Sequence, residues 1–126
     1  MMRQPAAVFA RGIHHRLAGD PGWRAFSGHW RLPVSPRLIR LETKPWQSAT
    51  FDGWRFEFTL EARLPGHAEA AAPLLCDRLC AALHDADLPL PGQVVIELNA
   101  INTVIEAQAK GAATCRVTFN ALTVED

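Results

Sequence analysis

Two cysteines and a histidine are spaced four residues apart in one stretch of the chain. Cys76, Cys80 and His84 would follow one edge of a helix, and thiolate and imidazole are ligands that zinc prefers. Structural zinc sites, however, rarely take three ligands from successive turns of one straight helix, and cysteine is often a small buried apolar residue. The spacing therefore favours buried side chains over a metal site, and we expect no cofactor.

The other residues that could support catalysis form no recognisable arrangement. His14 and His15 are adjacent, so about 100° of helix rotation separates them and they cannot easily share one ion or substrate atom. A cysteine–histidine nucleophilic pair would have no local signature here. The chain also lacks a pair of catalytic carboxylates, a glycine-rich phosphate loop and a nucleophile elbow. We therefore expect a protein that is not an enzyme.

The overall composition limits the class of protein. A chain of 126 residues is long enough for one core, so we expect a single domain over residues 1–126. Lysine plus arginine equals aspartate plus glutamate at 13 each, which disfavours a large nucleic-acid footprint. The chain has no apolar run of about 18 residues, as a membrane helix needs. The N-terminal apolar stretch is interrupted by Arg11, His14 and His15, so we expect no signal peptide and a cytoplasmic origin. The three cysteines of a chain that is not secreted should then be free thiols.

Apolar periodicity predicts the helices. Residues 6–18 carry apolar side chains four apart after Pro5, and Asp20-Pro21 is typical of an N-cap that starts one or two further turns. The main helix has an apolar stripe, and Pro73 indicates that its regular part begins near Ala72. The members of this stripe are Ala68, Ala72, Leu75, Leu79 and Leu83.

Alternation of side chains predicts the strands. We expect a strand over residues 37–44 that ends before Pro45, a turn at Asp52-Gly53, and a long strand over residues 54–64. Residues 93–98 alternate as a third strand that residues 101–107 continue or follow, and residues 114–126 form the last, with a bulge near Leu122. The predicted fold class is α+β: an antiparallel sheet of four to five strands with two helices packed on one face. The helix near Ala72 should cover the apolar side of the 54–64 strand.

The long strand has a charged side, and the loop before it carries aromatic residues. Arg55, Glu57, Glu61 and Arg63 share one parity, which is typical of a solvated sheet face; because the signs interleave, it could instead meet another copy or a partner. Trp46 and Phe51 lie in the polar loop, either as interface anchors or buried by a loop that folds back. The six residues are our candidate interface, with no catalytic, cofactor or metal residues assigned.

Several stretches together resemble a known family. They are "AVFARGIHHRLAGDPGWRAF", "RLIRLETKPWQSATFDGWRFEFTLEAR", "HAEAAAPLLCDRLCAAL", "LPLPGQVVIELNAINTVIEA" and "CRVTFNALTVED". The most similar parts are "TKPWQSATFDGWRFEFTLEA" and "LCAALHDADLPLPG". In element order and length the chain resembles the tail-completion or tail-terminator proteins of long-tailed phages, including those carried by gene transfer agents. The pattern contains no invariant catalytic motif. Pro73 departs from it, since such proteins usually keep an unbroken alanine-rich helix there.

The resemblance implies a structural virion part. It implies a homo-oligomeric ring, commonly a hexamer, that caps the tail tube protein, joins it to a head-tail connector or stopper protein, and lets DNA pass through its lumen. It implies a location in the virion tail or neck, with assembly in the bacterial host cytoplasm and no membrane. Near-neutral charge suits a channel that lets DNA slide. In a closed ring, one patch meets a different patch on the next copy.

Three alternatives remain open at this stage. One is another neck or head-completion protein of the same particle. Another is a small cytoplasmic α+β ligand-binding protein or enzyme, which a deep apolar pocket near His29, His67 or Cys115 would favour. A third is an RNA binder, which zero net charge and the lack of aromatic residues interleaved with lysines disfavour.

Overall fold

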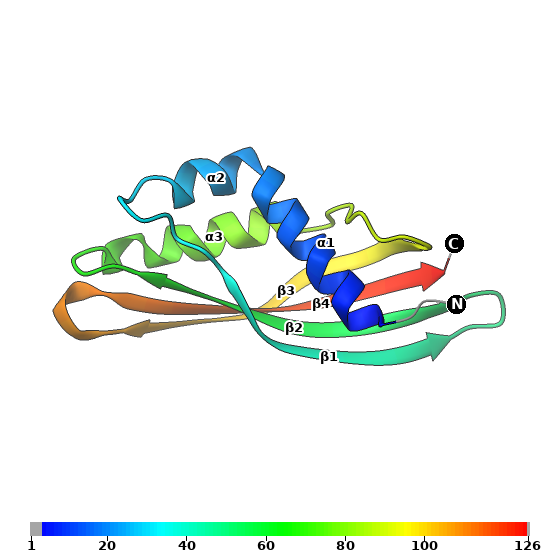
Figure 1. Ribbon diagram of the computed structural model, residues 1–126. Helices are drawn as coiled ribbons and strands as arrows, with labels where there is room; N and C mark the ends of the chain where they lie inside the picture. Colours follow the sequence, from blue (N-terminus) through cyan, green and yellow to red (C-terminus); the bar gives the residue numbers. More distant parts are fainter. Residues whose placement is uncertain (1–3, 126) are drawn as a thin grey trace.

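Three α-helices lie on one side of a four-stranded antiparallel sheet in the computed structural model, which describes residues 4–125 (Figure 1). The helices are α1 Pro5–Gly19, α2 Pro21–Ser27 and α3 Ala72–Leu83. The strands are β1 Arg37–Gln47, β2 Asp52–Leu64, β3 Gln93–Ala107 and β4 Ala113–Glu125. They are arranged in the order β1-β2-β4-β3, so β1 and β3 are the edges. The predicted α+β class is confirmed, with three helices instead of two.

The helix boundaries follow the predicted signals. Pro5 and Pro21 stand at the first helical positions of α1 and α2, where the missing N–H costs nothing. The Asp20 carboxylate accepts a hydrogen bond of 2.8 Å from the Trp23 backbone N–H and so caps α2. A 3₁₀ turn, η1 Glu69–Ala71, precedes α3, which begins at Ala72 with Pro73 in its first turn. None of the described helices is long and apolar enough to cross a membrane.

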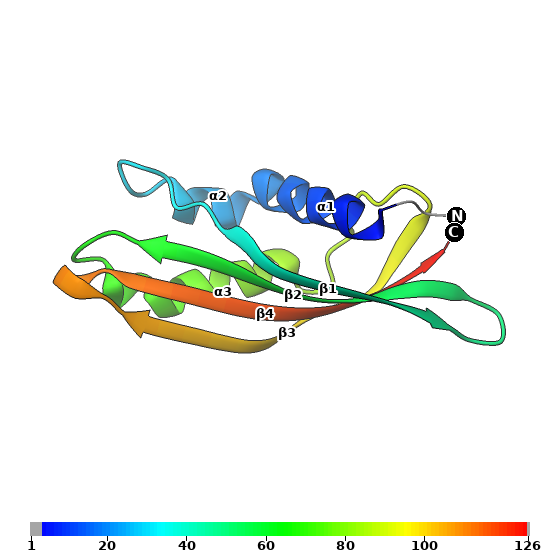
Figure 2. The same cartoon turned by 60° about the horizontal axis from the view of Figure 1, so that its bottom comes forward.

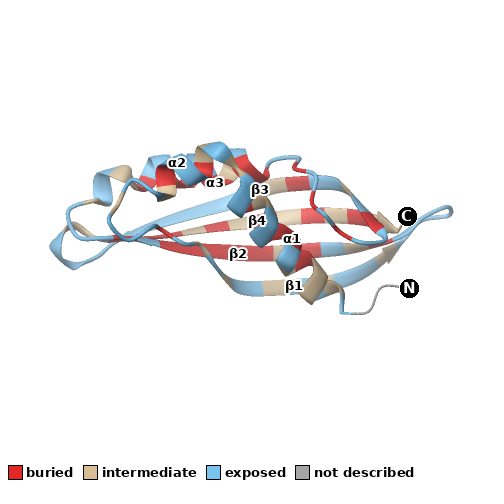
Figure 3. Ribbon diagram, turned by 45° about the horizontal axis from the view of Figure 1, so that its top comes forward, coloured by how far each residue is buried: buried red, intermediate tan, exposed pale blue. Residues whose placement is uncertain are grey.

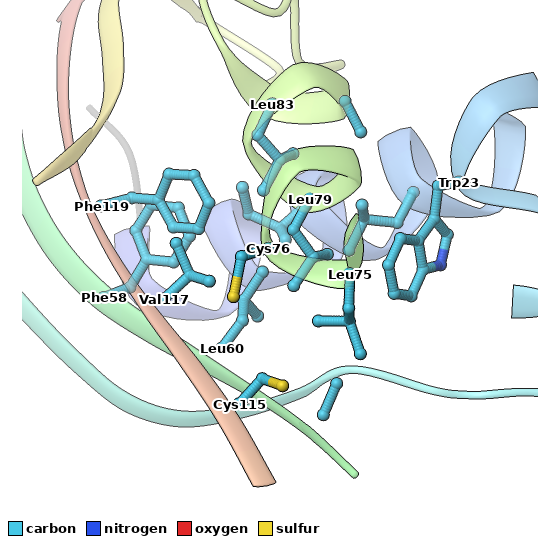
Figure 4. Packing of buried hydrophobic residues seen from close by; sticks show 14 of the residues in the cluster. Trp23, Phe58, Leu60, Leu75, Cys76, Leu79, Leu83, Cys115, Val117 and Phe119 are labelled. Atoms are coloured by element: carbon cyan, nitrogen blue, oxygen red, sulfur yellow. The ribbon is translucent and has the colours of Figure 1, made fainter. Parts of the chain in front are cut away.

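The core lies between the helices and the sheet. The Phe9 ring of α1 stacks on Phe56 of β2 at a centroid distance of 4.0 Å and meets Phe58 edge-on. The stripe of α3, with Leu75, Leu79 and Leu83 fully buried, lies mainly over β4 and β3 (Figure 4). The expectation that one helix covers the apolar side of β2 was therefore incomplete, because α1 supplies part of that cover.

The β1–β2 hairpin differs from the prediction at both strand ends. Strand β1 continues through Pro45, which pairs with Trp54, to Gln47. The prediction that Pro45 ends the strand was wrong because β1 is an edge strand, where a residue without an N–H is tolerated. Asp52 and Gly53 already belong to β2, so the turn is not at these residues. It closes earlier, where the Ser48 N–H donates to the Phe51 carbonyl over 2.8 Å.

Bulges change which side chains face the helices. The register shifts at residues 38–40 of β1, so Leu38 and Leu41 both become half-buried. Strand β3 has two such shifts, and the first leaves Val94 and Ile96 exposed while Leu98 is buried. Strand β4 pairs with β2 without a shift, so the bulge predicted near Leu122 is not in β4 itself. It lies in the facing strand β3, where the register shifts opposite Leu122 and Thr123. The sheet residues 93–107 form one continuous strand.

Candidate functional site

Figure 2 shows the sheet face that carries no helix, which we call the open face. The charged parity of β2 lies on this face, because the alternate residues Phe56, Phe58 and Leu60 are buried in the core beneath the helices. Several charged side chains on this face form hydrogen bonds with one another across neighbouring strands. Arg116 of β4 lies opposite Glu61 and donates to it over 3.1 Å, and it donates to Glu106 of β3 over 2.6 Å. These hydrogen bonds, to Glu106 first and then to Glu61, raise the pKa of Arg116. Three strands are thus joined by one Glu–Arg–Glu ladder.

The middle of the open face is partly closed to solvent by its own side chains. Glu61 is only 9% exposed, and Thr59 is 7% exposed where its hydroxyl lies 2.9 Å from the Thr118 hydroxyl of β4. Figure 3 shows buried positions along the central strands β2 and β4. Near the β1 edge, Arg40 contacts Glu42 and Glu57 at 2.7 and 3.1 Å. The hydrogen bond from Arg40 lowers the pKa of Glu42. Fixed pairs, not free ions, therefore make up much of the charged surface.

Both arginines of the candidate interface are accessible. Arg55 is exposed, and the Arg63 side chain is 73% exposed with one contact of 3.6 Å to Glu61. Glu57 is half-buried beside Arg40. Of the four charged candidates, Arg55 and Arg63 are therefore the more available for an outside partner.

Trp46 lies on the open face, because it pairs with Gly53 and shares the parity of Glu42 and Lys44. Its indole N–H crosses over Gly53 and donates to the Thr123 carbonyl of β4 over 2.9 Å. A Cβ at Gly53 would lie 1.9 Å from that carbonyl oxygen, so only glycine allows this crossing. Trp46 therefore has a structural contact within the chain as well as a half-exposed surface.

Phe51 is different, since it closes the β1–β2 loop with 54% of its surface exposed. The structure does not bring it together with the arginines on the sheet in one compact site. Trp46 is nearer to them, at the same end of the sheet as Arg55, because Gly53 and Arg55 are successive residues of one parity. The six candidate residues thus extend along β1 and β2 instead of converging on a point.

The cysteines lie in or beside the core. Cys76 of α3 faces Cys115 of β4 across the helix–sheet interface, and both are buried (Figure 4). Burial raises the pKa of the Cys115 thiol to about 11, so it stays protonated at neutral pH. His84 is an exposed residue at the end of α3, 3.2 Å from Asp85. Between residues 4 and 125, no three histidine, cysteine or acidic side chains cluster closely enough to hold a metal ion.

Surface hollows exist near the tryptophans. One of about 540 Å³ is lined by residues 30–35 together with Glu61, Arg63 and Leu64. Another of about 350 Å³ lies between α2 and α3 and includes His29, Trp30 and Arg78. Cys115, by contrast, is fully buried. His29 and Arg78 thus line the same hollow.

Sequence reasoning missed one prominent surface. Val94, Ile96, Ile101, Val104 and Ile105 of β3 are each between 40% and 50% exposed. The signal was present in "INTVIEA", where apolar residues occupy both parities and so cannot all face one core. The bulges add to the effect, because Ile96 and Ile101 are the additional residues at the two shifts.

Comparison with known proteins gives two findings. The family model described as "Tail completion protein gp17" matches residues 11–124 of this chain. A chain of the solved structure described as "Virion of native gene transfer agent (GTA) particle" matches with a TM-score of 0.78. Its identity is 18%, over 99% of this chain and 100% of that chain, so it supports the likeness of fold. No curated protein matches the chain.

Proposed function

Because the family model spans nearly all of its length, the chain belongs to the tail completion protein gp17 family, and we propose that it is a tail terminator. A protein of this family is a structural part of a phage-type tail, and the family is not one of enzymes. The proposed terminator acts as a single domain in a ring, with six copies expected, that caps the finished tail tube. The family match over residues 11–124 is the observation that carries the proposal.

The proposed neighbours are the tail tube protein on one side and a head-side connector or stopper protein on the other. The likeness of fold to a chain of a gene transfer agent virion supports a place in such a particle. DNA would pass through the lumen, and the zero net charge of the chain favours sliding over tight binding. The location is then the tail or neck of the virion, with assembly in the host cytoplasm.

We assign the candidate interface residues to contacts within the particle. Phe51 presents an exposed aromatic ring on a loop, which is typical of an interface anchor. Arg55 and Arg63 are accessible charges for matching a partner of opposite sign, and rim charges of this kind chiefly affect the rate and specificity of association. Glu57 and Glu61 would hold the side chains of Arg40 and Arg116 in place on the open face. Trp46 would hold the loop that presents Phe51.

The experiment that tests this function locates the protein on assembled tails. Purified protein is mixed with tail tubes of the same particle and viewed by electron microscopy after labelling with an antibody to the chain. A terminator labels one end of each tube, and tubes assembled without it grow beyond their normal length. Label along the tube, or label on heads that have no tail, would instead favour another neck or head-completion protein.

A further inference from the structure

The outer half of β3 is uncovered on both of its faces. Every residue from 100 to 107 is exposed, although this segment includes Ile101, Val104 and Ile105. Cross-strand pairing places Val104 opposite Arg116 on the open face and Ile105 opposite Cys115 on the helix face. Figures 1 and 2 show the end of the β3–β4 hairpin projecting past the start of α3. No described helix therefore covers this outer half of β3.

The edge position of β3 adds unpaired backbone groups to this surface. Among the described strands, β3 pairs with β4 alone. Near the middle of β3 the Leu98 carbonyl accepts a hydrogen bond of 2.9 Å from the Asp85 N–H, and beyond it residues 100–107 are exposed. Long exposed apolar edges are aggregation-prone, and soluble proteins usually shorten, charge or cover them. We call this surface the β3 edge; it comprises Val94, Ile96, Glu97, Ile101, Val104, Ile105 and Glu106.

Strand β1, at the opposite margin of the sheet, has a charge complementary to that of β3. Strand β1 carries three basic residues and one acidic residue, namely Arg37, Arg40, Lys44 and Glu42. Strand β3 carries two acidic residues, Glu97 and Glu106, and no basic one. Ile39 stands at the β1 bulge with 44% of its surface exposed, which gives this margin an apolar residue too. We call the surface of Arg37, Ile39, Arg40, Glu42 and Lys44 the β1 edge.

Each edge has a charged residue that is available to pair with another molecule. Within residues 4–125, neither Lys44 nor Glu97 makes an ion pair. Opposite potentials on two surfaces steer their association and reject like-charged partners. Contact between two β3 edges would instead bring the acidic residues of both copies together.

Strand direction allows the two edges to meet in a repeating way. All neighbouring strands in the order β1-β2-β4-β3 are antiparallel, so β1 and β3 run in opposite directions. A second copy in the same orientation would therefore lay its β3 antiparallel to the β1 of the first. This contact is heterologous, and repetition with a fixed rotation closes a ring. Pro45 and the bulges interrupt a regular ladder, so side chains would carry much of the contact.

We propose that the β3 edge of one copy docks against the β1 edge of the next copy. The inference rests on the proposed ring and names the surfaces that close it. Two interactions would stabilise this contact. The aliphatic residues of the β3 edge would pack against Ile39, and the opposite charges of the two edges would attract each other. The helices then remain on one side of a sheet that continues from subunit to subunit.

The test uses two variants that each block one edge. Ile39→Asp combined with Lys44→Glu alters the β1 edge, and Ile101→Asp combined with Val104→Asp alters the β3 edge. All four positions are exposed, so circular dichroism and urea unfolding should show folded proteins. Leu74→Asp is the matched control, since Leu74 is 46% exposed but lies on α3, away from both edges.

Native mass spectrometry then reports the assemblies. We expect rings from the wild type and the control, monomers from each variant alone, and 1:1 heterodimers from their mixture, because one intact edge of each kind remains. Rings from either variant, self-dimers of the β1-edge variant, or a mixture that stays monomeric would overturn the docking scheme while leaving the ring function in place. A wild type that stays monomeric both alone and with tail tubes would overturn the ring function and this inference together.

Discussion

The indole N–H of Trp46 donates a hydrogen bond of 2.9 Å to the carbonyl oxygen of Thr123, on a strand that is not its neighbour. Strand β2 lies between them, and the indole reaches β4 only because Gly53 has no side chain. This single contact connects the edge strand β1 to the centre of the sheet. It also fixes the base of the loop that presents Phe51.

Gly53→Ala should destabilise the protein by about 1–3 kcal/mol, in the range of overpacking substitutions. The added methyl group would meet the Thr123 carbonyl and the Trp46 indole nitrogen, at 1.9 and 2.7 Å, so one of them must move. Urea unfolding measures the change. Gly19→Ala at the end of α1 is the control, because a Cβ there meets nothing within 4 Å and should cost no stability. Equal stability of the two variants would refute the crossing contact.

Trp46→Phe should cost about 0.5–1.5 kcal/mol, because the ring remains while the hydrogen bond is lost. The Thr123 carbonyl then has no indole donor. The comparison is made by urea unfolding with Gln47→Ala, an exposed neighbour on the same strand, which should change little. A wild-type unfolding midpoint for Trp46→Phe would show that the indole N–H does not contribute.

Phe51→Ala should leave the free energy of unfolding within about 0.5 kcal/mol of wild type, since more than half of the ring surface is exposed. Ring assembly or tail joining should nevertheless weaken, because an exposed aromatic anchor is lost. Native mass spectrometry and counts of tailed particles measure this effect. Thr50→Ala in the same loop serves as the control. Undiminished assembly by Phe51→Ala would exclude it from the interface.

Arg55→Ala should be tolerated within about 0.5 kcal/mol, whereas Glu61→Ala should cost about 1–3 kcal/mol. Both residues belong to the same parity of β2, but Arg55 is exposed and Glu61 is buried beside Arg116. Loss of the carboxylate removes one acceptor from the Glu–Arg–Glu ladder. Chemical unfolding of both variants in one buffer provides the comparison. If the two costs were equal, the ladder would have no stabilising role.

Alkaline pH should destabilise the fold through its buried thiols. Burial raises the pKa of Cys115 from the usual 9.0 to about 11, so the folded state holds this proton more tightly than the unfolded chain does. The contribution of this thiol to the free energy of unfolding is therefore fully present below about pH 9 and is lost as the pH rises toward 11. The chain has no tyrosine, which leaves few other groups titrating there. Urea midpoints between these pH values should fall, and Cys115→Ala should flatten the decline.

The half-buried Cys80 supplies the comparison for that measurement. Burial raises its pKa as well, but the side chain lies only partly in the core. Cys80→Ala should therefore keep most of the alkaline decline. The slope with pH is the quantity to compare, since Cys115→Ala also leaves a small cavity that lowers stability at every pH. An unchanged slope in Cys115→Ala would contradict the burial of that thiol.

The fold class and most elements could be predicted from local sequence signals. The alternation of β2, the apolar stripe of α3, the Asp20 cap and the start of α3 near Pro73 all depend on residues close together in the chain. These signals act through side-chain direction and backbone hydrogen bonding, which nearby residues determine. The same patterns, taken together, were sufficient for the family resemblance that the family model now bears out.

Tertiary structure decided what the local patterns leave open. Pro45 remains in a strand because β1 is an edge of the sheet. Gly53 lies in β2 beneath the Trp46 indole, where a side chain at this position would clash with the indole. Glu61 is buried since β4 brought Arg116 beside it, although its parity in the sequence is that of a wet face. Strand order and bulge positions arise from pairing between residues far apart in the chain, and they determine which apolar side chains of β3 remain exposed.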